Sequence, residues 1–113
     1  MKKYLLRIRK IDKFFFDTLR QGSKTIETRA ATDKFLNIKK GDTLVFVCGK
    51  QRLEKRVKKV SYFKTIDRML KKLNLKKIMP FVSSIEEAKR IYYSFPNYNK
   101  KIAKFGLVAI ELE

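Results

Sequence analysis

The feature that most constrains the fold is the apolar segment Thr43–Cys48, because turn signals bound it on both sides. Lys39-Lys40-Gly41-Asp42 precedes it, and Gly49-Lys50 follows it. A short apolar run between such signals is typical of a β-strand, and two intervening residues are enough for a hairpin turn. The segment Arg52–Tyr62 then returns with alternating charged residues. We therefore predict that these two segments form a β-hairpin.

The returning strand does not keep a strict alternation. Val57 and Val60 are three positions apart, so they cannot face the same side of a regular strand. One extra residue near Lys58 and Lys59 restores the register, and we predict a β-bulge there.

Shorter segments on either side of the hairpin predict the rest of the fold. Apolar or alternating runs indicate strands, and apolar residues at helical spacing indicate helices. The expected strands are Tyr4–Arg9, Thr25–Arg29 and Leu107–Leu112, and the expected helices lie around Ile11–Leu19, Ile66–Leu73 and Ser84–Phe95. We predict one α+β domain over residues 1–113, with about five strands in a curled or barrel-like sheet and three or four helices.

Local signals add detail to these elements. Asp12 and Ser84 are predicted helix N-caps, and Gly22 stands where a helix ends in a left-handed residue. The aromatic and aliphatic residues at helical or strand spacing are predicted to pack in the core: Phe14, Phe15, Phe46, Ile91 and Phe95.

The chain carries a large excess of positive charge. Among 113 residues, 29 are Lys or Arg and 11 are Asp or Glu, which gives a net charge of +18. Repulsion of this size opposes a compact state unless a polyanion offsets it, so we expect nucleic acid as the partner. The alternative is a compositional bias of an AT-rich genome, which also favours lysine.

Chemistry that depends on histidine or on paired cysteines is excluded. The sequence has no His, and Cys48 is its only Cys, so no metal site, cofactor or His-based triad is expected. An unpaired thiol in an apolar strand predicts a buried, reduced Cys48 and a cytoplasmic location. No apolar stretch approaches the ~20 residues of a membrane span, so we expect a soluble protein without a membrane partner. We also expect it to be a monomer.

The octet Gly22–Arg29 is the strongest candidate for a binding site. It follows a helix end and continues as a strand that places Glu27 and Arg29 on one face. Arg29 offers a planar fork and Lys24 a point charge for a phosphate, and Glu27 can accept a hydrogen bond from an exocyclic amine of a base. The alternative is an ion-paired strand face in solvent, which is common.

The same residues resemble a known family. The pattern Gly22-x-Lys24-x-x-Glu27-x-Arg29, then Lys40-Gly41-Asp42 before an apolar strand, is similar to the ASCH domains of the PUA-like superfamily. The later segments Val60–Phe63, Ser84–Ala88 and Gly106–Leu112 extend the likeness over nearly the whole chain. The resemblance implies a PUA-like β-barrel of five to six strands flanked by helices, with the octet lining a cleft that binds RNA or a nucleotide.

One branch of ASCH-like proteins hydrolyses an acyl amide on a modified cytidine nucleoside. Its motif has a Lys, a Thr where Glu27 stands here, and a later carboxylate. Lys24 matches this motif, but Glu27 replaces the Thr, and no acidic residue lies between Asp67 and Glu86.

Further bases and aromatics are candidate contacts for RNA. The returning strand places bases on both faces, so Arg52, Arg56 and Lys58 are predicted to flank a polyanion, with a solvated surface as the alternative. Tyr62 and Tyr93 are candidates for stacking on unpaired bases, with packing as the alternative.

Three functions remain open from the sequence. The first is an RNA-binding or nucleotide-binding module whose basic cleft, built by Lys24, Glu27 and Arg29, takes one base or phosphate. The second is a hydrolase of a modified nucleoside, or a ribonuclease, with Lys24 as the base and Glu27 as the proton carrier. The third is a partner-binding domain whose charge is incidental.

Overall fold

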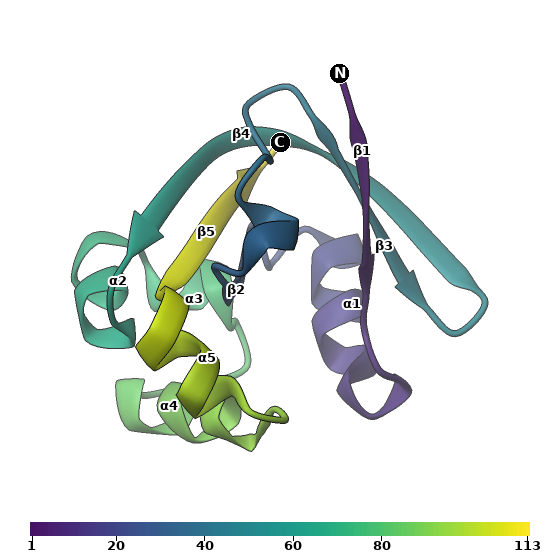
Figure 1. The fold of residues 1–113 in the computed structure, drawn as a ribbon. Helices are drawn as coiled ribbons and strands as arrows, with labels where there is room; N and C mark the ends of the chain where they lie inside the picture. Colours follow the sequence, from purple (N-terminus) through teal and green to yellow (C-terminus); the bar gives the residue numbers. More distant parts are fainter.

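A computed structural model describes residues 1–113 as one α+β domain around a five-stranded sheet (Figure 1). The strand order is β1-β3-β4-β5-β2, and every neighbouring pair is antiparallel except β1 and β3, which are parallel. The strands are β1 (Lys3–Arg7), β2 (Ile26–Ala30), β3 (Thr43–Cys48), β4 (Gln51–Phe63) and β5 (Leu107–Leu112).

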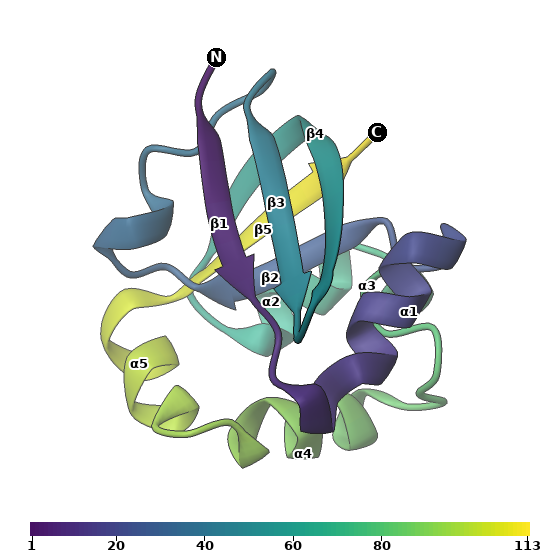
Figure 2. The same ribbon diagram turned by 90° about the vertical axis from the view of Figure 1, so that its right-hand side faces the viewer.

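The long strand β4 joins the two halves of the sheet. Its first part pairs with β3, and its second part pairs with β5. A register shift between Val57 and Lys59 lies between the two parts, which confirms the predicted bulge and the predicted hairpin. Because a bulge increases local bend and twist, β1 and β3 come to lie in front of β5 and β2, which run across behind them (Figure 2).

The sheet is open, so the β-barrel that the resemblance implied is not confirmed. The two edge strands, β1 and β2, share no backbone pairing. Instead the Arg29 side chain reaches from β2 to the carbonyl oxygen of Arg7 at the end of β1. A closed barrel requires a continuous ladder of backbone hydrogen bonds around it. Between β1 and β2 the hydrogen bond from the Arg29 side chain stands in place of that backbone pairing.

The helices cover the faces and one end of the sheet. They are the 3₁₀ turns Lys10–Asp12 (η1) and Asp33–Phe35 (η2), and α1 (Lys13–Gln21), α2 (Ile66–Lys72), α3 (Leu75–Ile78), α4 (Ile85–Ser94) and α5 (Tyr98–Phe105). The sequence predicted three or four helices, and α5 is the one it missed. Pro96 predicted the end of a helix, but Asn97, in the left-handed region at φ 61°, is the N-cap of a new helix, α5.

The predicted caps are confirmed at two of three positions. The Ser84 hydroxyl accepts a hydrogen bond from the Glu87 N–H at 3.1 Å, and Gly22 ends α1 with φ 86°. Asp12 stands at the N-cap of α1 without capping it, because its carboxylate accepts from Arg9 Nε at 2.7 Å instead.

The core is one cluster of 27 buried apolar residues, with Cys48 free and buried in it as predicted. Phe15 and Phe46 are buried, but Phe14 is 41% exposed and Ile11 is 77% exposed. The apolar stripe of α1 is Phe15, Phe16 and Leu19. The predicted core position of Phe14 and the predicted helix start near Ile11 were wrong because Lys10–Asp12 forms a separate 3₁₀ turn. The α-helix therefore begins later than the spacing of the apolar residues predicted.

No helix in the structure is long and apolar enough to cross a membrane.

Two glycines with positive φ are expected to differ in their tolerance of alanine. An added Cβ at Gly22 meets nothing within 4 Å, whereas at Gly106 it lies 2.6 Å from the Phe63 carbonyl oxygen. Gly106 also has φ 75° and ψ −161°, a region that only glycine visits readily. We expect Gly22→Ala to lower the free energy of unfolding by about 1 kcal/mol, and Gly106→Ala to lower it by about 2–3 kcal/mol. Urea unfolding measures both, and equal losses would contradict the close approach of Gly106 to β4.

Candidate functional site

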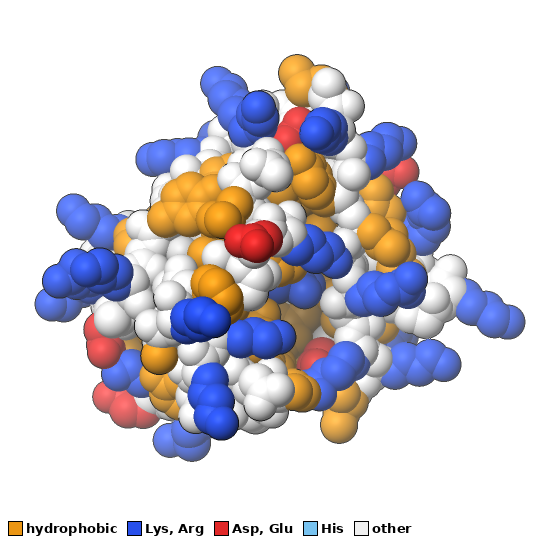
Figure 3. All heavy atoms as spheres, in the orientation of Figure 1, with side chains coloured by type: hydrophobic (Ala, Val, Ile, Leu, Met, Phe, Trp, Pro, Cys, Tyr) orange, Lys and Arg blue, Asp and Glu red, His pale blue; other side chains and the backbone are white.

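A cleft of about 280 Å³ opens between β2, the end of β1, and helices α1, α4 and α5. Figure 3 shows a hollow near the centre of one face, with apolar surface inside and Lys and Arg side chains around it. Five basic and two acidic residues line the cleft together with aromatic and apolar ones: Arg7, Ile8, Arg9, Asp12, Phe15, Lys24, Glu27, Thr28, Arg29, Met79, Tyr92, Phe95, Pro96, Tyr98 and Lys101.

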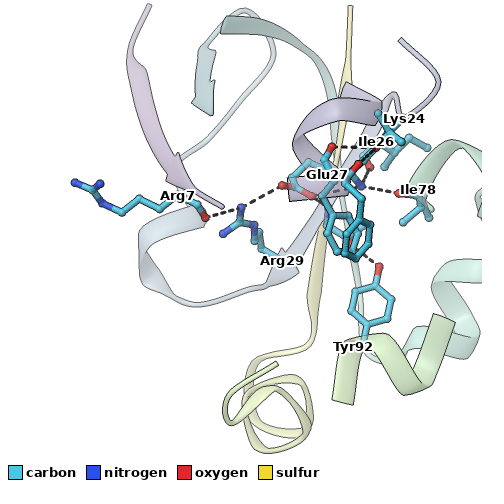
Figure 4. Close-up of polar contacts among 11 residues, drawn as sticks. Arg7, Lys24, Ile26, Glu27, Arg29, Ile78 and Tyr92 are labelled. Atoms are coloured by element: carbon cyan, nitrogen blue, oxygen red, sulfur yellow. Dashed lines mark hydrogen bonds and ion pairs between the residues drawn. The ribbon is translucent and has the colours of Figure 1, made fainter. Parts of the chain in front are cut away.

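Lys24 is the most deeply buried charge of this site, with 2% of its surface exposed. Gly22 turns the chain after α1, so that the Lys24 side chain runs under β2. Its Nζ donates to the carbonyl oxygens of Ile26 at 2.7 Å and Ile78 at 2.6 Å, and lies 3.5 Å from Glu27 Oε1 (Figure 4). An ammonium has three protons to donate, and three acceptors surround it here.

These contacts give Lys24 a structural role. Burial lowers the pKa of Lys24 from its ordinary value, and the charge of Glu27 opposes that shift. The charged form has a proton for each of the three oxygens, whereas a neutral amine has only two. Lys24 therefore ties β2 to the end of α3 and is not placed as a free base.

Glu27 lies on β2 beside Lys24 and is 6% exposed. Its Oε1 accepts from the Thr28 N–H at 3.0 Å, and its Oε2 accepts from Arg29 Nη2 at 3.1 Å. Burial alone raises the pKa of Glu27, but the charges of Lys24 and Arg29 and these hydrogen bonds outweigh it and hold the pKa below its usual range. The carboxylate is ionised, and because each oxygen offers two lone pairs, Oε2 keeps one position open.

Arg29 joins the open edges of the sheet and faces the cleft. Its Nη2 donates to Glu27 Oε2 and, at 3.4 Å, to the Arg7 carbonyl oxygen. Its guanidinium carbon lies 5.9 Å from the centre of the Phe35 ring. Figure 4 shows Arg29 between Arg7 and Glu27, with the Arg7 side chain pointing away. Since a guanidinium has five N–H donors, Arg29 still has donors for an anionic ligand.

Aromatic residues form the other walls of the cleft. The Phe95 ring centre lies 6.0 Å from that of Phe15 and 5.1 Å from that of Tyr98. The Tyr92 hydroxyl, reaching in from α4, forms a hydrogen bond with the Thr28 hydroxyl on β2. Burial raises the pKa of Tyr92 and Thr28 opposes it only partly, so the phenol stays neutral. The cleft thus has apolar rings beside a fixed carboxylate and a guanidinium.

The structure brings together the three residues predicted from the octet and separates the others. Lys24 and Arg29 converge on Glu27 in a recess and do not point apart into solvent. Tyr93 is 52% exposed on α4, and Tyr62 is 51% exposed near the end of β4, both outside the cleft. The three basic residues of β4 that were predicted to contact RNA are exposed and line no part of the cleft either: Arg52, Arg56 and Lys58.

Sequence reasoning missed several lining residues. Arg9, Thr28 and Tyr92 were not among the predicted site residues. Thr28 carried one usable signal, since it lies between Glu27 and Arg29, but alternation along a strand predicts that it faces away from them, whereas its hydroxyl meets Tyr92 in the cleft. Which residues of α4 and α5 line the cleft depends on how these helices pack against the sheet, and no local sequence pattern indicates it. No group of three His, Cys, Asp or Glu side chains is close enough to hold a metal ion.

The ionised Glu27 makes stability depend on pH. Its pKa is below the ordinary 4.5 in the folded state, so at acidic pH the unfolded chain binds more protons and the free energy of unfolding falls as the pH drops. We expect Glu27→Gln to be less stable at neutral pH but to lose less stability below about pH 4.5 than the wild type. Urea unfolding over that range measures the difference. Parallel curves would contradict an ionised, paired Glu27.

The comparisons with known proteins agree with this architecture. The ASCH domain family model matches residues 10–113. The crystal structure of hypothetical protein PH0355 is 32% identical with a TM-score of 0.84, and the match covers 100% of this chain and 98% of that chain. The solution NMR structure of protein PF0455 from Pyrococcus furiosus is 33% identical with a TM-score of 0.76, over 98% and 96% of the two chains. No curated protein matches this sequence. A family match over nearly the whole length, with two structural neighbours of the same fold, shows that the chain belongs to the ASCH domain family.

Proposed function

We propose that the protein binds single-stranded RNA and takes one nucleotide into the cleft. The observation that carries the proposal is the ionised Glu27 carboxylate, which lines the cleft among aromatic rings and basic side chains and has an Oε2 lone pair that its hydrogen bonds do not use. These groups match the parts of a nucleotide: aromatic rings can pack on the face of the base, the carboxylate can accept a hydrogen bond from its edge, and basic side chains can bind the phosphate. Membership of the ASCH family, whose domains are expected to bind RNA, supports the same assignment.

Each wall of the cleft has a part in this proposal. Phe95 and Tyr98 supply rings beside which a base can pack, and the Arg9 guanidinium lies over the Phe95 ring, 5.7 Å from its centre. Glu27 Oε2 accepts an N–H from the base edge, which selects ligands with a donor at that position. The guanidinium of Arg29 takes an anionic oxygen of the nucleotide, and the exposed Arg9 and Lys101 at the mouth take neighbouring phosphates.

The experiment compares two double variants that remove the same charge. Arg9→Gln with Lys101→Gln removes two bases from the cleft mouth. Lys72→Gln with Arg90→Gln removes two exposed bases from α2 and α4, outside the cleft. Affinity for a fluorescent single-stranded RNA is measured by anisotropy over a range of salt concentrations. The cleft variant is expected to reduce the log–log salt slope by about 1.4, because each contact to a single strand contributes ~0.7.

The control variant is expected to keep the slope of the wild type. Equal effects of the two variants would mean that RNA is held by diffuse charge, and the proposal would fail. The cleft variant is expected to remain folded, because Arg9 and Lys101 are exposed and loss of the exposed Arg9–Asp12 ion pair costs about 1 kcal/mol or less.

A further inference from the structure

A second hollow lies at the far end of α5, outside the cleft. It has a volume of about 590 Å³ and no acidic residue in its lining, which consists of Tyr62, Phe63, Lys64, Thr65, Ala103, Lys104, Phe105, Gly106 and Leu107. Two of its aromatic rings are unusually open to solvent, Tyr62 at 51% and Phe105 at 42% exposed. The ammonium of Lys104 lies 5.1 Å from the centre of the Phe105 ring. Rings beside lysines form the kind of surface on which unpaired bases stack.

The helix α5 connects this hollow to the cleft. Its first turn contributes Tyr98 and Lys101 to the cleft, and its last turn contributes Lys104 and Phe105 to the hollow. At 1.5 Å per residue, Tyr98 and Phe105 are separated by about 10 Å along the axis. Figure 1 shows α5 running from the side of α4 to the start of β5, next to the end of β4. A strand that leaves the cleft along α5 reaches the hollow within a short distance.

The second wall of the hollow is held rigidly beside α5. Tyr62 and Phe63 at the end of β4 pair with Val108 and Leu107 at the start of β5. Gly106 links α5 to β5, so close to β4 that an added Cβ would lie 2.6 Å from the Phe63 carbonyl oxygen. The sheet thus fixes the backbone of Tyr62, and its hydroxyl donates to the Leu36 carbonyl oxygen at 3.4 Å, while half of the side chain's surface stays exposed.

We infer that this hollow is a second RNA-contact surface, on which a base next to the nucleotide in the cleft stacks against Tyr62. The inference rests on the proposed function, because it assumes that the cleft holds a nucleotide of the same strand. The occupant is RNA because every charged residue of the lining is a lysine, which complements phosphate, and because the rings accept any base face. Lys64 and Lys104 hold the phosphates on either side of the stacked base.

The test compares two ligands and two tyrosines. Uridine monophosphate occupies the cleft alone, whereas a single-stranded RNA of about ten nucleotides also reaches the hollow. Tyr62→Ala removes the stacking ring without changing the charge. Tyr93→Ala is the matched control, because Tyr93 is equally exposed at 52% and lines neither cavity. Tyr62→Phe keeps the ring and removes only the hydroxyl.

Tyr62→Ala is expected to weaken binding of the RNA about tenfold and to leave binding of the mononucleotide unchanged, since stacking of one base accounts for a change of this size. Tyr93→Ala and Tyr62→Phe are expected to bind the RNA like the wild type. If Tyr62→Ala binds the RNA as tightly as the wild type, or if Tyr93→Ala weakens it equally, the second surface is wrong while the cleft proposal stands. If the wild type binds neither ligand at low salt, both proposals are wrong.

Discussion

Replacing Lys24 with methionine is expected to lower the free energy of unfolding by about 3–5 kcal/mol, because removal of one partner from a buried ion pair leaves the other charge uncompensated. Methionine keeps most of the length of the side chain and its packing against Phe15. The carbonyl oxygens of Ile26 and Ile78 lose their donor, and Glu27 loses one of its two cationic neighbours. The fall in the free energy of unfolding therefore comes from the lost charge and hydrogen bonds, because the volume of the side chain changes little.

Urea unfolding at neutral pH measures this loss. Lys13→Met is the control, since Lys13 is exposed at the start of α1 and a surface change of this kind costs about 0.5 kcal/mol or less. A double-mutant cycle with Glu27→Gln is expected to show a coupling of about 1–3 kcal/mol between the two side chains. If Lys24→Met unfolds like the control, Lys24 is not the structural tie that its contacts indicate.

Raising the salt concentration from about 50 to 200 mM is expected to weaken RNA binding by about 250-fold. The reason is release of counterions, because about six phosphates neutralised on a single strand give a log–log slope near −4. The net charge of +18 and the basic residues at the cleft mouth and the second hollow supply enough cations for this number. Anisotropy titrations at several salt concentrations measure the slope, and a flat dependence would remove the electrostatic basis of the proposal.

Much of the chain could be predicted from its local pattern. The turn residues around Thr43–Cys48 predicted the hairpin, and the spacing of Val57 and Val60 predicted the bulge, because both depend only on side-chain alternation along one strand. The left-handed Gly22 predicted the end of α1. The alternation of Glu27 and Arg29 on β2 likewise predicted that their side chains meet, and the structure pairs them at 3.1 Å.

The remaining features depend on how distant segments pack. Whether β1 and β2 pair to close a barrel is decided by the bend of the sheet, which no local pattern determines. The partners of Lys24 include the Ile78 carbonyl oxygen, 54 residues away, so its burial and structural role were not visible in the octet. Tyr92, not the adjacent Tyr93, reaches the cleft, because the position of α4 against the sheet sets which side of the helix is buried.

RNA is expected to enter the cleft beside Glu27 and not to spread over the basic surface. Titration of ¹⁵N-labelled protein with short single-stranded RNA, followed by backbone amide chemical shifts, tests it most directly. We expect the largest shifts at Thr28, Arg29 and Lys101, with smaller ones at Tyr62 and Phe105. Shifts centred on Arg52, Arg56 and Lys58, with Thr28 and Arg29 unmoved, would contradict it.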